Sequence, residues 1–177
     1  MLWKAFGILV QGDVFAVMGK ASDAVQMITS GIAAMRSTGS TFFAPLHLSY
    51  LARAHAELGQ FDDAWRCLGE AMTAVETTGE KLWEAEVYRT AGDIALSPEP
   101  DAAKAEGYFE RALTVARQQQ AKSWELRAAM SLGRLWRDQG KSQQARELLA
   151  PVYGWFTEGF DTRDLQEAKA LLDTLAH

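Results

Sequence analysis

The feature that most constrains the fold of this chain is an internal repeat of about 40 residues. Four aromatic residues recur at intervals of 40, 40 and 41 residues, namely Trp3, Phe43, Trp83 and Trp124. Nine residues after each aromatic comes a small residue, in the order Gly12, Ala52, Gly92 and Gly133. Columns that keep phase over four units predict a chain of stacked copies of one supersecondary unit.

Two further columns complete the unit and are typical of helices. An alanine recurs as Ala24, Ala64, Ala105 and Ala145, and four residues later a large apolar residue recurs as Ile28, Leu68, Phe109 and Leu149. Within a unit, Leu48, Leu51, Ala52 and His55 follow the helical spacing i, i+3, i+4, i+7. The short link "GQF" forces this helix and the next to run antiparallel. Each unit is therefore predicted to be a helical hairpin, and the chain to be all-α.

Glycines occupy two kinds of position in the unit. Gly19, Gly59 and Gly140 stand at hairpin turns, and Gly39 and Gly79 follow second helices, where a positive φ ends a helix at little cost. Gly12, Gly92 and Gly133 stand inside first helices, where glycine costs about 1 kcal/mol relative to alanine. We expect close helix crossings at these three positions, so that Gly133→Leu would overpack one of them.

These columns resemble those of the tetratricopeptide repeat, including a further alanine in the second helix (Ala71, Ala112). The resemblance covers almost the whole chain and implies an α-α superhelix, or solenoid, of about four hairpins. The chain departs from the family in its period, which is 40 or 41 residues and not 34, and in its third turn, which reads "SPEPD". The proline that usually ends the second helix is also missing. HEAT-type helical repeats share the longer period and are the alternative architecture.

The repeats predict a single domain over residues 1–177, divided at about 1–40, 41–80, 81–121 and 122–161, with a capping helix over 163–176. Thr162 is the expected N-cap of this last helix, and Asp164 lies in its first turn. Its apolar stripe consists of Leu165, Ala168, Leu171, Leu172 and Leu175. A stacked array needs such a helix to cover its apolar end. Trp3 begins a repeat without a matching cap, so the chain is expected to be the tail of a longer protein.

Charge and composition disfavour several classes of function. The net charge of −5 and the pI near 5.2 give no basic footprint for nucleic acid. The sequence has no long uncharged apolar run that would span a membrane. Its N-terminus lacks the basic region and the cleavage site of a signal peptide, and its one cysteine, Cys67, cannot form an intramolecular disulfide. We therefore expect a cytoplasmic protein that binds neither nucleic acid nor membrane.

One short motif raises the question of nucleotide chemistry. Gly140, Lys141 and Ser142 are the last three letters of a phosphate-binding loop, but Leu135 stands where that loop needs its first glycine. Because Gly140 shares its column with Gly19 and Gly59, the motif is interpreted as a helix turn.

The remaining candidate groups predict no site either. His47, His55 and His177 lack the spacing of a zinc site, and Cys67 has no histidine close to it in sequence. Two acidic pairs stand at expected helix starts, where carboxylates complement the helix dipole: Asp62 with Asp63, and Glu84 with Glu86. We expect no catalytic residue, no metal and no cofactor, and hence no enzyme.

The first helices of such repeats line a concave face, and counting from the small-residue column predicts which side chains lie there. The predicted partner-binding residues are Phe6, Leu9, Asp13, Ser49, Tyr50, Arg53, Glu86, Arg89, Asp93, Arg127, Met130 and Arg134. The N-terminal half of this groove is expected to be apolar and the C-terminal half rich in arginine. One interpretation is that Asp13, Arg53, Asp93 and Arg134 form a ladder of ion pairs between repeats. The other is that the arginines bind an acidic peptide or a carboxylate.

A more specific resemblance covers the final third of the chain. The stretch from Ala121 to Leu172, and above all "LLAPVYGWFTEGFDT", resembles the C-terminal repeat region of large bacterial signalling proteins. Those proteins join a class III cyclase domain or a winged-helix regulator to an AAA-type ATPase and then to tetratricopeptide repeats. The resemblance implies a non-catalytic regulatory module whose partner is a protein or peptide, including the ATPase or cyclase part of a parent chain. A small-molecule sensor and an oligomerisation module that forms a homodimer are the alternatives.

Overall fold

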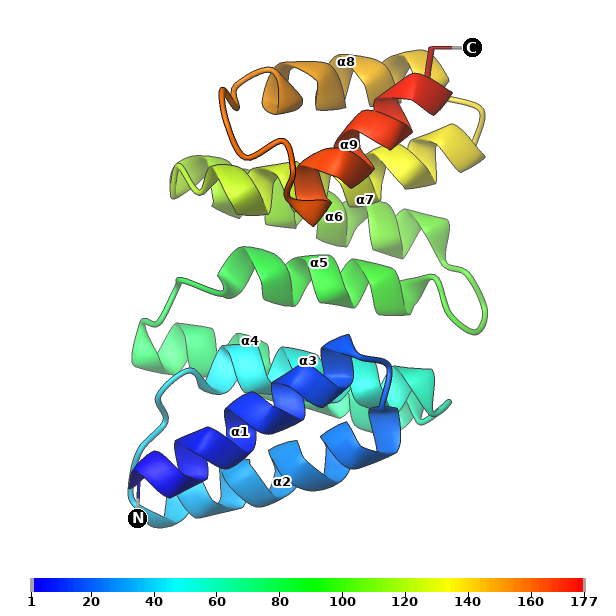
Figure 1. Ribbon diagram of the computed structural model, residues 1–177. Coiled ribbons are helices and arrows are strands. Elements are labelled where there is room, and N and C mark those ends of the chain that lie inside the picture. The colour runs from blue at the N-terminus through cyan, green and yellow to red at the C-terminus, as the bar shows by residue number, and fades with distance from the viewer. Residues whose placement is uncertain (1, 177) are drawn as a thin grey trace.

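The computed structural model describes residues 2–176, which form nine α-helices and no strand (Figure 1). The prediction of an all-α chain is therefore confirmed. In chain order the helices are α1 (Leu2–Val17), α2 (Ala21–Ser37), α3 (Ala44–Glu57), α4 (Phe61–Thr78), α5 (Glu84–Ala95), α6 (Ala102–Gln118), α7 (Lys122–Asp138), α8 (Ser142–Tyr153) and α9 (Arg163–Thr174). None of the helices in this range has the length and apolar character needed to cross a bilayer.

Consecutive helices pair as antiparallel hairpins, and the hairpins α1–α2, α3–α4, α5–α6 and α7–α8 stack one on the next (Figure 1). Three hairpin turns contain a glycine of positive φ, which is 71° at Gly19, 74° at Gly59 and 78° at Gly140. The interpretation of Gly140 as a helix turn is thus confirmed, because Gly140 lies between the end of α7 at Asp138 and the start of α8 at Ser142.

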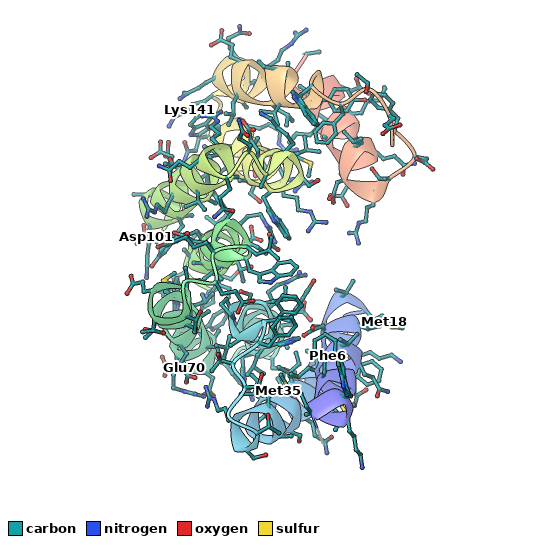
Figure 2. All side chains as sticks on the ribbon, turned by 90° about the vertical axis from the view of Figure 1, so that its left-hand side faces the viewer. Phe6, Met18, Met35, Glu70, Asp101 and Lys141 are labelled. Carbon is teal, nitrogen blue, oxygen red and sulfur yellow. The ribbon has the colours of Figure 1, made fainter. Side chains whose placement is uncertain are left out.

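The stack of hairpins curves into a C (Figure 2). The first helices α3, α5 and α7 lie on its inner side, and the second helices α4 and α6 lie on its outer side. Helices α1 and α9 stand at the two ends of the C and face each other across its opening. This curvature creates a concave face bordered by both ends of the chain.

The repeated alanine and large apolar columns form the core. Ala24, Ala64, Ala105 and Ala145 are completely buried, as are Ile28, Leu68, Phe109 and Leu149. Alanine allows the two helices of a hairpin to approach closely, and the large residue one turn later fills the space beside the contact. The columns are therefore repeated because each hairpin makes the same contact.

The aromatic column joins successive hairpins at the start of their first helices. Trp83 meets Phe43 and Trp124 edge to face, with ring centroids 5.7 and 5.6 Å apart. Such edge-to-face pairs contribute about 0.5–1.5 kcal/mol each beyond the area that they bury. Trp3, the first member of the column, is 82% exposed.

The glycines inside first helices differ in how closely they are packed. A Cβ at Gly12 would lie 2.6 Å from Ile28 Cγ1, and a Cβ at Gly92 would lie 2.3 Å from Phe109 Cε1. At Gly133 the nearest atom, Leu171 Cδ2, is at an ordinary 3.6 Å. The expected close crossing is therefore present at Gly12 and Gly92, whereas at Gly133 a Cβ would fit in ordinary van der Waals contact with Leu171 and Ala145.

Helix α9 covers the far end of the stack, as predicted. Leu165, Ala168 and Leu171 are buried against the last hairpin. Thr162 occupies the N-cap position, but its hydroxyl donates to the carbonyl of Gly159 at 2.7 Å and accepts no hydrogen bond from the helix. The prediction of Thr162 as the N-cap is therefore confirmed for its position, without a side-chain hydrogen bond to the helix, and Asp164 lies in the first turn as expected.

Candidate binding groove

The concave face holds a cleft of about 610 Å³ between α3, α5, α7 and the start of α9. Val17, at the end of α1, borders it from the opposite side of the opening. The other residues that line the cleft are Tyr50, Arg53, Glu86, Arg89, Arg127, Met130, Ser131, Arg134, Thr162, Arg163, Asp164 and Glu167. We call this cleft the groove.

Seven of the predicted partner-binding residues line the groove, namely Tyr50, Arg53, Glu86, Arg89, Arg127, Met130 and Arg134. They come from three successive first helices and recur at the same positions of the repeat. Of the residues predicted in the second, third and fourth hairpins, Ser49 and Asp93 are the two that do not line the groove.

The predicted residues of the first hairpin lie elsewhere. Leu9 is buried against Gly31 of α2, where an added Cβ would come within 2.6 Å of Leu9 Cγ. Phe6 packs among the rings of Phe42, Phe43 and His47. Helix α1 thus turns these apolar side chains toward its neighbours, and the expected apolar half of the groove is not formed by them.

Two polar residues of the predicted set are buried and hydrogen-bonded within the fold. Asp13 Oδ2 lies 2.8 Å from His47 Nδ1, and burial raises the pKa of Asp13 above its ordinary value. Ser49 donates its hydroxyl to the carbonyl of Pro45, one turn earlier in α3, at 2.8 Å. Both side chains therefore serve the packing of the hairpins and are out of reach of a ligand in the groove.

Arg89 is a largely buried cation of the groove, with its side chain 14% exposed. Its Nε and Nη2 donate to the two carboxylate oxygens of Glu86 at 2.8 and 2.7 Å, and its Nη1 donates to Asp93 at 2.5 Å. Burial alone would lower the pKa of Arg89, but the hydrogen bonds and charges of the two acids have the larger effect and raise the pKa above its ordinary value. The guanidinium therefore stays charged. The two parallel hydrogen bonds to Glu86 fix the position of the Arg89 guanidinium in the groove.

Helix α9 supplies carboxylates to the two arginines of α7. Arg127 Nε donates to Asp164 at 2.6 Å, and Arg134 Nη2 donates to Glu167 at 2.9 Å. Glu167 also accepts from Arg163 at 2.7 Å, and these hydrogen bonds outweigh desolvation and hold the pKa of Glu167 below its usual value. The start of α9 therefore occupies arginines that would otherwise face the groove.

The predicted ladder of ion pairs between repeats is wrong. Asp13 bonds to His47, Asp93 pairs with Arg89 of its own helix, and Arg134 pairs with Glu167. Asp13, Asp93 and Arg134 each have a nearer partner, one helical turn away or on another helix, and Arg53 forms no ion pair with any of the described residues.

Arg53 is the one arginine of the groove without an ion pair among the described residues. Beside it, Tyr50 has its pKa raised by burial and by the negative charge of Glu86, so its phenol stays protonated and can donate a hydrogen bond. The groove lining carries five arginines against three carboxylates, whereas the whole chain has a net charge of −5. The lining of the groove thus carries more positive than negative charge, although the chain as a whole is acidic.

Sequence reasoning missed the contribution of α9 to the groove. Thr162, Arg163, Asp164 and Glu167 all line it, because the loop after α8 carries the start of the capping helix back over α7. Asp164 and Glu167 are three residues apart, whereas their partners Arg127 and Arg134 are seven apart, so the spacing in the sequence does not indicate these pairs.

The other residues considered for chemistry do not form a site. Residues 2–176 contain no group of three or more histidine, cysteine or acidic side chains arranged to hold a metal. Burial raises the pKa of the Cys67 thiol to about 11, so the thiol is protonated and unreactive near neutral pH. His55 Nδ1 lies 2.6 Å from Gln60, and His177 lies outside the described residues.

Comparison with known proteins defines the fold class. No protein-family model and no curated protein matches the sequence. A solved structure of a kinesin light chain-like protein from Podosopora anserina, with nearly identical TPR-like repeats, aligns with a TM-score of 0.71 over 99% of this chain and 86% of that chain, at 15% identity. A point variant of the same protein aligns with a TM-score of 0.67 over 98% and 93% of the two chains, at 16% identity. The chain is thus similar in fold to tetratricopeptide-like repeat solenoids.

Proposed function

We propose that this chain is a non-catalytic scaffold for protein–protein interaction, and that its concave groove binds an acidic segment of a partner protein. The observation that carries the proposal is the excess of arginine over carboxylate in the groove of an acidic chain. Arginine suits this role because its planar fork pairs with carboxylates in a fixed geometry.

The proposal assigns different roles to the arginines. Arg53 has no carboxylate partner and is ready to receive one from a ligand, with the phenol of Tyr50 beside it. Arg127 and Arg134 are held by Asp164 and Glu167, whose side chains are partly exposed. The carboxylates of an acidic ligand that reaches α7 would replace Asp164 and Glu167 as the partners of these two arginines.

The cellular setting follows from the resemblance of residues 121–172 to bacterial signalling proteins. In this proposal the chain is the regulatory C-terminal repeat module of a larger bacterial protein of the cytoplasm. The acidic segment belongs either to the ATPase or cyclase part of that parent chain or to a separate protein.

The direct test is the affinity of a fluorescein-labelled, glutamate-rich peptide, measured by fluorescence anisotropy, with a glutamine-for-glutamate peptide as reference. Arg53→Ala is expected to weaken binding about tenfold, which corresponds to about 1.4 kcal/mol for a lost charged contact. The matched control is Arg146→Ala, because Arg146 is exposed on the outer helix α8. Equal effects of the two substitutions would refute the groove as the binding site.

A second variant tests the exchange of carboxylates. Asp164→Asn combined with Glu167→Gln removes both competing charges while keeping the shape of the side chains. We expect this variant to bind the acidic peptide more tightly than the wild-type protein, because Arg127 and Arg134 lose their internal partners. An increase in affinity is informative because general damage to the fold could not produce it. A decrease in affinity would contradict the assignment.

An oligomerisation module is a second candidate, favoured by the exposed face of α1. Val10 and Val14 are exposed, whereas their equivalents in the third hairpin, Thr90 and Ile94, are buried. In α5 this face receives the preceding hairpin, so in α1 it could receive a second copy of the chain. Light scattering of the wild-type protein and of Val14→Glu separates the candidates, because only a dimer through α1 would dissociate on substitution.

A further inference from the structure

A second cavity lies on the outer side of the molecule, between the first and second hairpins. It has a volume of about 480 Å³, within the range of small-molecule sites. Its walls come from α2, the loop after it, α3 and α4, and Leu9 reaches it from α1. Ile32, Met35, Phe42 and Leu48 give it a mainly apolar lining.

The equivalent spaces between later hairpins are smaller and polar. The space between the second and third hairpins has about 340 Å³, and all of its lining residues stand one repeat after residues that line the first cavity. Where the first cavity has Ala44 and Leu48, the second has Glu84 and Tyr88. The next space has about 290 Å³ and contains Glu125 with its partner Lys122 at 2.7 Å. The repeat therefore always leaves a gap here, and only the first gap is apolar.

The two charged side chains at the first cavity, and the threonine hydroxyls that α4 contributes to it, already have partners. Arg36 Nη2 and Glu70 Oε2 pair across its rim at 2.9 Å, so the rim carries no net charge. Thr73, Thr77 and Thr78 donate their hydroxyls to carbonyls of their own helix at 2.9, 2.8 and 2.7 Å. A charged ligand would find no free counter-charge among these groups.

One lining residue has an unused polar atom. His47 is 1% exposed, and its Nδ1 is hydrogen-bonded to Asp13, 2.8 Å away. Among the described residues, His47 Nε2 is the only buried side-chain atom without a partner that belongs to a residue of the cavity wall. When Nδ1–H donates to the Asp13 carboxylate, the neutral ring offers a lone pair at Nε2, which accepts a hydrogen bond.

We propose that this cavity binds a small neutral molecule with an apolar, ring-sized body and one hydroxyl group that donates to His47. The apolar lining favours the body, the self-paired rim disfavours an ion, and the acceptor at Nε2 selects a donor. This function is separate from protein binding in the groove, because the two cavities lie on opposite sides of α3 and share no lining residue.

The experiment uses β-naphthol as the probe, with binding followed by its fluorescence. Thr73→Trp places a large ring against the cavity and is expected to weaken binding by about tenfold or more. Thr114→Trp is the matched control, because Thr114 stands one repeat later on α6, is also exposed, and makes the same hydroxyl contact to the carbonyl one turn earlier. Circular dichroism establishes that both variants remain folded.

A second probe tests the hydrogen bond. The methyl ether of β-naphthol keeps the apolar body but cannot donate, and we expect it to bind about fivefold more weakly, as for the loss of one hydrogen bond. Equal affinity of the two probes would overturn the role of His47. Absence of saturable β-naphthol binding, or equal loss in the Thr73→Trp and Thr114→Trp variants, would overturn the site itself.

Discussion

The sharpest test of the packing compares Gly92→Ala with Gly133→Ala, two substitutions in the same column of the repeat. A Cβ at Gly92 would lie 2.3, 2.5 and 2.9 Å from three ring atoms of Phe109. Phe109 is 1% exposed, so its ring has no free space to move into. A Cβ at Gly133 meets only Leu171 Cδ2 at 3.6 Å and Ala145 Cβ at 4.0 Å.

These distances predict that the two substitutions change the free energy of unfolding in opposite directions. Alanine gains about 1 kcal/mol over glycine in a helix interior, and at Gly133 nothing opposes that gain, so the free energy of unfolding should rise by up to about 1 kcal/mol. At Gly92 the overpacking cost of about 1–3 kcal/mol exceeds the gain, so the free energy should fall by up to about 2 kcal/mol. Urea unfolding followed by circular dichroism measures both. A loss at Gly133 as large as the loss at Gly92 would refute the reasoning.

Three further predictions concern the core, one ion pair and the exposed end of the stack. Cys67, with its pKa raised to about 11 by burial, should not react with Ellman's reagent at pH 7.5 until urea unfolds the chain; rapid reaction of the folded protein would contradict its burial. Glu125 accepts hydrogen bonds from Lys122 Nζ and Arg117 Nε at 2.7 and 3.0 Å, which outweigh desolvation and hold its pKa below the ordinary value. Its stabilisation is therefore complete above the unfolded-state pKa of about 4.3 and is lost as the pH falls through the folded-state pKa. Glu125→Gln should thus cost about 1–2 kcal/mol near neutral pH and progressively less below about pH 4; a cost independent of pH would show that the charge is not involved. Replacement of the exposed Trp3 by alanine should change the midpoint of unfolding less than replacement of Trp83, which lies between two rings; equal losses would contradict the role of the aromatic column.

The fold could be predicted from the sequence because each hairpin repeats one contact. Ala64 and Leu68 belong to columns that recur in the sequence, and both are buried in that contact. The glycines of positive φ stand at the turns between the helices. The packing at Gly133 could not be predicted in the same way. Its column is shared with Gly92, but the space beside it depends on whether the opposite helix offers a ring or a methyl group.

The candidate groove could be predicted where the repeat is regular and not at its ends. Tyr50, Arg89 and Arg127 line it because successive first helices present the same face. Leu9 does not, because Gly31 lets α1 and α2 approach so closely that Leu9 is buried between them. The part played by Asp164 depends on the path of the loop before α9, and no periodic pattern encodes that path.

The most direct test of the central claim is a nuclear magnetic resonance titration of the labelled protein with the glutamate-rich peptide. The proposal predicts that the largest shifts fall on the side chains and amides of Tyr50, Arg53 and Arg127, while Thr73 and Thr114 on the outer helices stay unchanged. Shifts confined to the outer helices, or saturable binding that leaves the groove residues unmoved, would contradict it.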